Sequence, residues 1–255
     1  MTARRETAKI RLDQHLQALG YFDSRAQAAA AIKAGQVFIN GQPARKASQT
    51  VSMHDRIDAQ AAHGFVSRGG LKLDKALTHF AYPVAGKTIV DVGASTGGFC
   101  DVLLKKDAKH IYALDVGQGQ LHEKIAADAR VANMEKHNAR AAMADWFEVA
   151  PEALVCDVSF ISVKLALDHL LSLTAPQAWA IILVKPQFEV GRSGLGKNGV
   201  VSDGARREKV CVDIKEWVEA HAAGWCVDDI IESPITGPQG NVEYLLGAHK
   251  RPASA

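Results

Sequence analysis

The chain lacks the cysteine pattern of a metal-binding or disulfide-bonded protein. Its four cysteines, at positions 100, 156, 211 and 226, are far apart and form no CxxC pair. Zinc sites, iron–sulfur clusters and disulfide frameworks need paired or closely spaced cysteines, so we expect none of these and no bound metal. Isolated thiols favour a reducing compartment, and we expect the protein to be cytoplasmic.

Long apolar runs are also absent. No stretch approaches the roughly 18 to 20 apolar residues that a membrane span needs. Residues 1–16 carry charges but no apolar segment behind them, so they do not predict a secretory signal. With 47% hydrophobic and 23% charged residues in 255, the composition is typical of a globular protein with one large or two modest domains. We expect no stable membrane association.

Charge is nearly balanced overall but unevenly distributed. The net charge of the chain is +2, and residues 1–60 hold nine Lys and Arg against five Asp and Glu. The first 60 residues therefore carry +4 and the remainder carries −2. A small basic domain joined to a larger, nearly neutral one suggests a polyanionic partner.

Residues 1–60 predict a small α+β domain. A short amphipathic helix over residues 11–20 is followed by an alanine-rich helix that starts after Asp23 or Ser24 and ends at Gly35. The pair Asn40-Gly41, flanked by apolar residues, predicts a β-hairpin. Residues 47–59 predict another pair of strands.

This helix–helix–hairpin order resembles the S4-type RNA-binding domain. The resemblance is carried by RLDQHL, SRAQAAAAIKAGQVFING and DRI, which together cover most of residues 10–60. It implies RNA contacts by basic residues on the helices and hairpin, which are Arg11, Arg25, Lys33, Arg45 and Lys46. We add Arg68, at the entrance of the next domain, to the expected RNA-binding residues. The alternative is a solvated face whose arginines bind nothing.

After an expected linker at residues 61–66, residues 67–255 alternate between strand and helix patterns. Apolar strands are predicted at residues 88–93, 110–116, 153–160, 179–186, 226–234 and 243–249. Helices are predicted between them at 99–108, 161–174 and 205–224. This alternation predicts an α/β fold with a doubly wound, mostly parallel sheet, in which ligands bind beyond the carboxyl ends of the strands.

A glycine-rich loop follows the first of these strands. The segment DVGASTGGF brings a carboxylate and several glycines to a strand end and a helix start, and Asp115 ends the next strand, where an acid can bind a ribose diol. The pattern looks like the S-adenosylmethionine pocket of a Rossmann-type methyltransferase, although glycine loops at helix starts are common. The implied cofactor residues are Asp91, Gly93, Ser95, Gly97, Gly98, Asp115 and, for the adenine, Asn138.

Four charged residues stand at predicted strand ends or on the first helix of this domain: Lys72, Asp157, Lys185 and Glu243. Lys185 is unusual because it ends the apolar run WAIILV, where an unpaired ammonium would be costly to bury. Each residue also has an ordinary explanation, as a solvated charge, a helix cap or a strand terminator. The four converge only if the sheet is wound as predicted.

The order Lys, Asp, Lys, Glu resembles the K-D-K-E set of FtsJ-type RNA 2′-O-methyltransferases. With SRGGLKL, DVGASTGGF, CDVSFIS, LVKPQFE, GNVEYLL and the S4-type segment, the chain from residue 8 to about residue 250 resembles the TlyA family, also called hemolysin A. The resemblance implies methyl transfer from S-adenosylmethionine to the ribose 2′-hydroxyl of a cytidine in ribosomal RNA. Ribosomal RNA or the ribosomal subunits would then be the partner.

In this hypothesis Lys185 is the base that accepts the hydroxyl proton. Asp157 and Glu243 orient it, and Lys72 favours its neutral form and stabilises the developing alkoxide. Burial and a second ammonium favour a neutral lysine, whereas the two carboxylates oppose it. Phe160 and Phe188 lie next to these residues and could stack on a base, but we expect both to pack in the core.

Residues 190–209, rich in glycine and basic residues, predict either a lid that contacts RNA or a disordered surface loop. Three other functions remain possible from the sequence. The protein could be a non-catalytic RNA-binding assembly factor for the ribosome, an enzyme acting on another RNA, or, from the name of its relatives alone, a membrane-active hemolysin. For the last, no basic amphipathic helix with aromatic anchors supports it.

Overall fold

The computed structural model describes residues 9–22, 24–52, 55–59, 64–191, 194–196, 199–221 and 224–251. Asp23, the first half of the linker expected at 61–66, and parts of the strand pair expected at 47–59, the loop at 190–209 and the helix at 205–224 lie outside these ranges. The chain divides into two compact units, Met1–Gly69 and Gly70–Ala255. Each unit is described by itself below.

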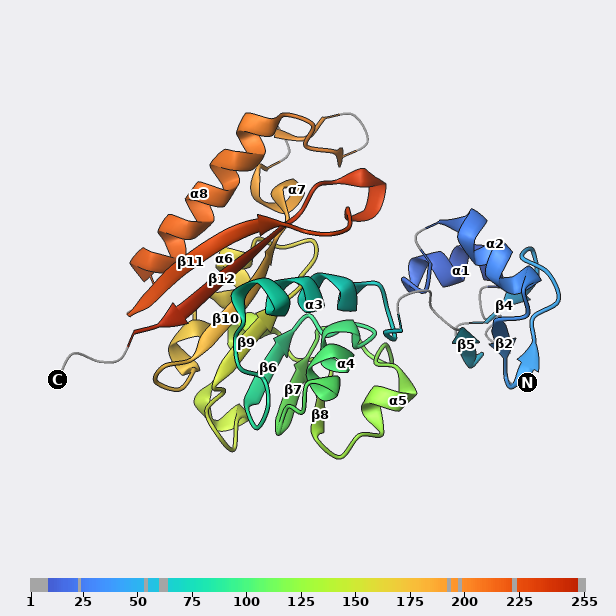
Figure 1. The fold of residues 1–255 in the computed structure, drawn as a ribbon, viewed down its shortest axis with the longest axis horizontal. Helices are drawn as coiled ribbons and strands as arrows, with labels where there is room; N and C mark the ends of the chain where they lie inside the picture. Colours follow the sequence, from blue (N-terminus) through green and yellow to red (C-terminus); the bar gives the residue numbers. More distant parts are fainter. Residues whose placement is uncertain are drawn as a thin grey trace, which may run out of the picture. The chain divides into compact units, whose positions relative to one another are not determined.

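The first unit is a small α+β domain (Figure 1), whose described residues form two helices and two small sheets. Ser24 caps the second helix by accepting a hydrogen bond from the Gln27 backbone N–H at 3.2 Å. The elements are β1 (Ile10–Arg11), α1 (Leu12–Ala18), α2 (Arg25–Lys33), β2 (Val37–Ile39), β3 (Gln42–Pro43), β4 (Thr50–Val51) and β5 (Ile57–Ala59).

The predicted hairpin is confirmed, and the predicted strand pair is rearranged. Asn40 and Gly41 have φ of 50° and 77°, the positive values that a tight two-residue hairpin turn requires. Both strands expected within residues 47–59 form, but β4 pairs with β1 and β5 pairs with β2, so they belong to different sheets. The core of the unit is built from Leu12, Leu16, Tyr21, Phe22, Ala28, Ala31, Ile32, Val37, Ala44, Val51 and Ile57.

The second unit contains a seven-stranded sheet in the order β11-β12-β10-β9-β6-β7-β8. β12 runs antiparallel to its neighbours β10 and β11, and the other neighbouring strands are parallel. The strands are β6 (Thr88–Val92), β7 (His110–Leu114), β8 (Val131–Met134), β9 (Ala153–Cys156), β10 (Trp179–Val184), β11 (Trp225–Glu232) and β12 (Tyr244–Lys250). The predicted α/β class with a mostly parallel sheet is confirmed.

Helices cover both faces of this sheet (Figure 1). α6 (Val163–Leu167) and α8 (Gly204–His221) share a core with the side chains on one face of the central strands. α3 (Gly69–Phe80) and α4 (Gly98–Lys105) lie on the other face, where Phe80 packs on Gly247 and Cys100 contacts Asp91. Both faces of the sheet are therefore covered by helices, as the continuous apolar strands predict.

Several elements differ from the sequence-based expectation. The helix expected at 161–174 is interrupted, with α6 followed by a 3₁₀ turn at Leu170–Leu173. The strand expected at 153–160 ends at Cys156. β8, α5 (Glu123–Ala126) and α7 (Pro186–Glu189) are not predicted, and the end of the expected loop at 190–209 is already part of α8. In α7, Pro186 occupies the first turn, where its missing N–H has no cost.

Candidate active site

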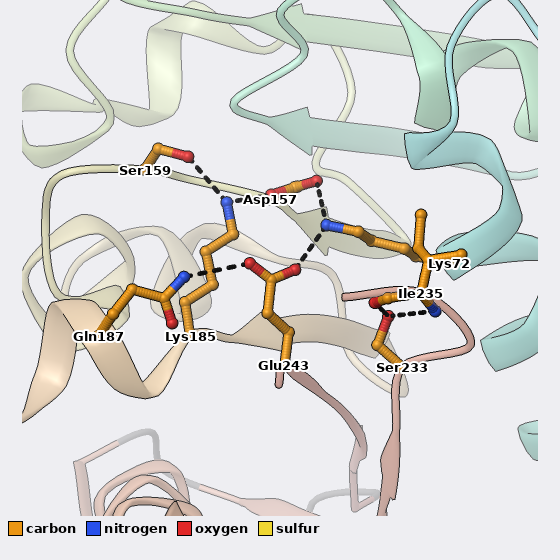
Figure 2. A network of polar contacts seen from close by, with 8 residues as sticks. All are labelled: Lys72, Asp157, Ser159, Lys185, Gln187, Ser233, Ile235 and Glu243. Carbon is orange, nitrogen blue, oxygen red and sulfur yellow. Dashed lines mark hydrogen bonds and ion pairs between the residues drawn. The ribbon is translucent and has the colours of Figure 1, made fainter. Parts of the chain in front are cut away.

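Four charged side chains from distant parts of the second unit meet at the carboxyl end of the parallel strands (Figure 2). Lys72 comes from α3, Asp157 follows β9, Lys185 follows β10 and Glu243 precedes β12. Because β12 runs in reverse, its first residues lie at the same edge as the last residues of β9 and β10. The two amines predicted to face one site therefore do so.

The four charges alternate in sign along a chain of contacts. Lys72 Nζ lies 2.7 Å from Glu243 Oε2 and 3.7 Å from Asp157 Oδ2. Lys185 Nζ lies 2.5 Å from Asp157 Oδ1. Lys72, Lys185 and Glu243 are 5%, 6% and 1% exposed. Each buried charge thus has an opposite partner, which meets the requirement for burying charges in a protein interior.

Asp157 is the centre of this arrangement. Burial alone would raise the pKa of its carboxyl, but the charges of Lys72 and Lys185 and their hydrogen bonds outweigh burial and hold the pKa below its ordinary value. Asp157 therefore stays ionised at neutral pH. Two ammonium groups on one ionised carboxylate are a stable resting arrangement, and loss of a proton from either amine would change the local charge balance.

Two neutral polar residues that sequence analysis missed extend the network. The Ser159 hydroxyl accepts a hydrogen bond from Lys185 Nζ at 2.8 Å, and Gln187 Nε2 donates to Glu243 Oε1 at 3.2 Å (Figure 2). Gln187 Oε1 is buried without a hydrogen-bond partner among the described residues. Each stands two residues after a charged member, Ser159 after Asp157 and Gln187 after Lys185, which is the only signal that the sequence offers.

The turn that carries Glu243 depends on a glycine. A Cβ on Gly237 would lie 2.2 Å from Glu243 Oε1 and 2.7 Å from its Cδ. Gly237 has φ of −69°, so its backbone is open to any residue and only the space is restrictive. Glycine at 237 is therefore what lets the carboxylate occupy its buried position.

The expectation that Phe160 packs in the core is wrong. Phe160 is 92% exposed and has φ of 66°, a conformation uncommon for a residue with a side chain. Its ring centroid lies 5.3 Å from that of Phe188, whose ring in turn lies 5.9 Å below Lys185 Nζ. The ring is therefore free to contact a ligand at the edge of the charged site.

The glycine loop borders this site. A Cβ on Gly93 would lie 2.7 Å from the Asp157 carbonyl oxygen, and Asp157 N–H donates to the Val92 carbonyl at 2.9 Å. Gly93 has φ of 85°, which also favours glycine. A ligand held by the loop would therefore lie next to the charged residues.

Asp91 differs from the other site carboxylates. It is fully buried in β6, its Oδ2 accepts from the Cys100 thiol at 3.0 Å, and its Oδ1 has no hydrogen-bond partner in the described ranges. Burial, with a smaller contribution from the charges of Asp157 and Asp115, raises the pKa of Asp91 to about 7. A buried carboxylate oxygen without a donor is a feature that a ligand can satisfy.

Asp115, immediately after β7, organises the loop from the other side. Its Oδ2 accepts from Ser95 N–H at 2.7 Å and its Oδ1 accepts from Gly117 N–H at 2.7 Å. Ser95 has φ of 47°, so this carboxylate holds the loop in a strained turn. Asp115 is half-buried and lies at the strand end where a ribose-binding acid is expected.

The remaining predicted cofactor residues frame the same loop. Gly97 has φ of 88° and precedes α4, which begins at Gly98, and a Cβ on Gly97 would lie 2.9 Å from Leu121. Asn138 follows β8 and caps a short 3₁₀ turn by accepting from Arg140 N–H at 3.1 Å. The glycine loop thus lies between β6 and α4, and Asn138 lies four residues after the end of β8.

The predicted RNA-binding residues all belong to the first unit. Lys33, Arg45 and Lys46 are exposed, and Arg68 is half-buried, with its N–H donating to the Gly20 carbonyl at 3.0 Å. Arg11 and Arg25 do not act separately, because both pair with the carboxylate of Asp13.

The described ranges contain no group of His, Cys, Asp or Glu side chains able to hold a metal ion.

In the part of the chain that the structure describes, no helix combines the length and the apolar character needed to cross a bilayer.

Comparison with known proteins agrees with this geometry. Residues 65–250 match the FtsJ-like methyltransferase family, and residues 10–57 match the S4 domain. The chain is 40% identical over 240 residues to the 16S/23S rRNA (cytidine-2'-O)-methyltransferase TlyA of Mycobacterium tuberculosis, covering 93% of this chain and 89% of that relative. It is 39% identical to Hemolysin A of Brachyspira hyodysenteriae, covering 92% of this chain and 98% of that relative.

A relative from Streptococcus thermophilus has a solved structure that matches with a TM-score of 0.81 at 38% identity, covering 96% of this chain and 90% of that one. The family match spans most of the second unit and includes all four charged residues. The chain therefore belongs to the FtsJ-like methyltransferase family, among its TlyA-type members that also carry an S4 domain.

Proposed function

We propose that this protein transfers a methyl group from S-adenosylmethionine to the ribose 2′-hydroxyl of a cytidine in ribosomal RNA. The observation that carries the proposal is the buried set of Lys72, Asp157, Lys185 and Glu243 beside the glycine loop. The Mycobacterium tuberculosis relative is named for this reaction on 16S and 23S rRNA, which supports the same substrate class here.

The glycine loop and the strand ends around it would hold the cofactor. S-adenosylmethionine, when bound, supplies an electrophilic methyl group on a sulfonium centre. Gly93 and Gly97 leave backbone open to a ligand, and Asp115 is suited to a ribose diol. Asp91 Oδ1 has no hydrogen-bond donor among the described residues, and an amino group of the cofactor would provide one. Ser95 and Gly98 complete the loop, and Asn138 would contact the adenine.

Lys185 is the group that accepts the proton of the ribose hydroxyl. A hydroxyl is a weak nucleophile at neutral pH, so a base must remove its proton as the new carbon–oxygen bond forms. A lysine can do this only as a neutral amine, so Lys185 must first release a proton. Ser159 is exposed and bonded to Lys185 Nζ, and its hydroxyl offers a route for that proton to solvent.

Lys72 stays charged and assists. Its ammonium is fixed between Glu243 and Asp157, so it disfavours a second positive charge on Lys185 and attracts the negative charge that develops on the ribose oxygen. Asp157 and Glu243 orient the two amines. The rest of the catalysis is alignment of the hydroxyl, the methyl carbon and the sulfur in line.

Phe160 is suited to hold the target base. Its ring is exposed next to Ser159 and tilted against Phe188, so one face is available to a nucleotide base. RNA-binding proteins commonly stack splayed bases on such aromatics, and each stack contributes about 1–3 kcal/mol. A base stacked on Phe160 would bring its ribose close to Lys185.

The first unit would bind the RNA backbone. Arg11, Arg25, Lys33, Arg45, Lys46 and Arg68 give it a basic surface, and phosphate contacts of this kind dominate RNA affinity. The S4 match supports an RNA partner, and we infer ribosomal RNA or a ribosomal subunit, in the cytoplasm, as the specific one. The lid expected at residues 190–209 stays a prediction, and residues 204–209 of that range belong to α8.

The decisive experiment is methyl transfer from labelled S-adenosylmethionine to transcribed ribosomal RNA and to isolated subunits, followed by mapping of 2′-O-methyl positions. We expect label on a cytidine ribose, and loss of label with Lys185→Ala while RNA and cofactor still bind. Label on a base, or near-normal turnover by Lys185→Ala, would overturn the proposal. RNA binding without any transfer would favour an assembly factor, and leakage of liposomes without transfer would favour a hemolysin.

A further inference from the structure

In the first unit, one buried acid pairs with two exposed arginines. Asp13 is 4% exposed, while the side chains of Arg11 and Arg25 are 43% and 49% exposed. Arg11 donates from Nε to Asp13 Oδ1 at 3.0 Å and from Nη2 to Oδ2 at 2.9 Å. Arg25 donates to Oδ2 from Nε at 3.3 Å and from Nη2 at 3.0 Å. One buried carboxylate therefore fixes two exposed guanidinium groups.

The carboxylate is itself fixed. Asp13 Oδ1 also accepts from the Gln14 backbone N–H at 3.0 Å, and Asp13 N–H donates to the Ala47 carbonyl at 3.1 Å. The hydrogen bonds to Arg11, which exceed the opposing effect of burial, hold the pKa of Asp13 well below its ordinary value. Asp13 is therefore ionised at any physiological pH, and these backbone hydrogen bonds fix its position.

Other basic residues lie alongside. The Leu12 N–H donates to the Gln49 carbonyl at 2.7 Å, and Arg11 pairs with Thr50 in the β1–β4 ladder. The loop that precedes β4, which carries Arg45 and Lys46, is thus joined to the start of α1. These contacts bring the segment that carries Arg45 and Lys46 next to the start of α1, while the charges that act on Asp13 itself are those of Arg11 and Arg25.

Charge alone makes Asp13 unfavourable for an RNA-binding surface. It cancels one of the two arginine charges beside it, and every phosphate contact depends on positive charge. Geometry argues the opposite. Arginine binds phosphate through a planar fork of N–H groups, and a free side chain loses rotamer freedom when it binds. With Nε and Nη2 held on Asp13, the outer N–H groups of each guanidinium face away from the carboxylate.

We propose that Asp13 is a positioning residue that presents Arg11 and Arg25 as one preorganised phosphate-binding unit. The inference rests on the proposed binding of RNA by the first unit. Counting charges predicts that removal of this negative charge strengthens RNA binding, whereas the positioning role predicts that it weakens RNA binding. The ligand is a backbone phosphate of RNA, and the carboxylate acts through the two arginines without touching it.

The test is Asp13→Asn in the full-length protein, with transcribed 23S ribosomal RNA as the probe at two salt concentrations. We expect about a tenfold loss of affinity, a raised KM for RNA and an unchanged kcat at saturating RNA. The matched control is Asp58→Asn, which removes the same charge from an exposed pair with Arg56 at 3.4 Å. Asp58→Asn should bind RNA at least as tightly as the parent protein.

Two further variants separate the possible failures. Arg11→Lys combined with Arg25→Lys keeps both charges and removes the forks, so it should lose affinity like Asp13→Asn, and it decides the question if Asp13→Asn does not fold. If Asp13→Asn binds as tightly as the parent, or the lysine pair retains full affinity, the inference is overturned. If Arg11→Ala with Arg25→Ala also binds normally, RNA binding by this surface is itself overturned.

Discussion

Each unit has a carboxylate next to its proposed binding residues that is shared by two cations, and these two examples, Asp157 and Asp13, differ in nearly every other respect. Asp157 joins Lys72 and Lys185, which come from distant parts of the chain and are almost completely buried. Asp13 joins Arg11 and Arg25, which are near neighbours in sequence and half-exposed. The first arrangement needs a complete fold, and the second needs only β1, α1 and α2, which follow one another along the chain.

The difference in cation is chemically meaningful. A buried lysine can lose its proton and serve as a base, whereas arginine stays charged under all ordinary conditions. Burial makes such a proton transfer possible, and exposure makes a phosphate contact possible. The same pattern of charges therefore suits proton transfer in the second unit and anion binding in the first.

The largest expected effect comes from replacing the buried lysine that acts as the base with arginine, the cation of the Asp13 arrangement. Lys185→Arg keeps the charge beside Asp157 but cannot act as a base, so kcat should fall by about 10²–10⁴. Lys72→Arg retains the charge on which its proposed role depends and should lose less. Turnover is measured with labelled methyl transfer at saturating RNA, with cofactor affinity measured by calorimetry. Equal losses in the two variants would contradict separate roles for the two lysines.

The next effect comes from displacing the fourth charge. In Gly237→Ala the new Cβ would collide with the buried Glu243 carboxylate, which would leave Lys72 with a weakened partner. We expect kcat to fall by about 100-fold, as small misplacements in active sites do. Gly204→Ala is the control, because a Cβ there meets only the end of Arg207 at 3.8 Å. Full activity in Gly237→Ala would show that Glu243 can move without harm.

A smaller effect is expected from the exposed ring beside the buried charges. Phe160→Ala should lower kcat/KM for RNA by about 5- to 150-fold, because a base stack contributes about 1–3 kcal/mol. The free energy of unfolding should change by less than about 0.5 kcal/mol, since the ring is exposed. Val212→Ala, another exposed apolar residue, serves as control. A large loss of stability with normal kinetics would assign Phe160 to folding.

The smallest effect concerns Asp91, whose pKa of about 7 is raised rather than lowered. Between about pH 4 and pH 7 the folded protein keeps a proton that the unfolded chain releases, so raising the pH favours unfolding. Relative to Asp91→Asn, the unliganded protein should lose about 1 kcal/mol of stability per pH unit between pH 5 and pH 7. Urea unfolding at several pH values measures this difference.

Asp157 should behave in the opposite way. Its pKa is below the ordinary value, so the stability it contributes is present above the ordinary pKa and is lost as the pH falls through the folded pKa.

For Asp91, the contradicting outcome is a difference in the free energy of unfolding between the parent and Asp91→Asn that does not change with pH. It would mean that the Asp91 carboxyl is not buried as described.

Much of the second unit could be predicted from sequence because its signals are local. Continuous apolar runs end in Asp157 and Lys185, and the carboxyl ends of parallel strands meet at one edge of a sheet, so their proximity follows from the fold class. The glycine loop and Asp115 are similarly local. Glu243 was expected at a strand start, although that it reaches the same edge depends on the reversed direction of β12.

The missed features depend on tertiary contacts. Phe160 follows an apolar strand and looks like core, but the chain leaves the sheet after Cys156 and turns the ring outward. Gly237 has an ordinary φ, so only the packed carboxylate reveals why a side chain is excluded. Asp13 looks like a surface charge of an amphipathic helix, and its role appears only when Arg25 of the next helix reaches it.

The reversed strand has a consequence for synthesis on the ribosome. β12 is the last strand of the sheet in chain order, yet it inserts between β10 and β11 and delivers Glu243 beside Lys72. A nascent chain that has not yet emerged to residue 243 holds the cofactor loop and three of the four charges, but its Lys72 ammonium has lost its nearest counter-ion. Competence for methyl transfer would then arise late and abruptly, when the hairpin of β11 and β12 pairs with β10.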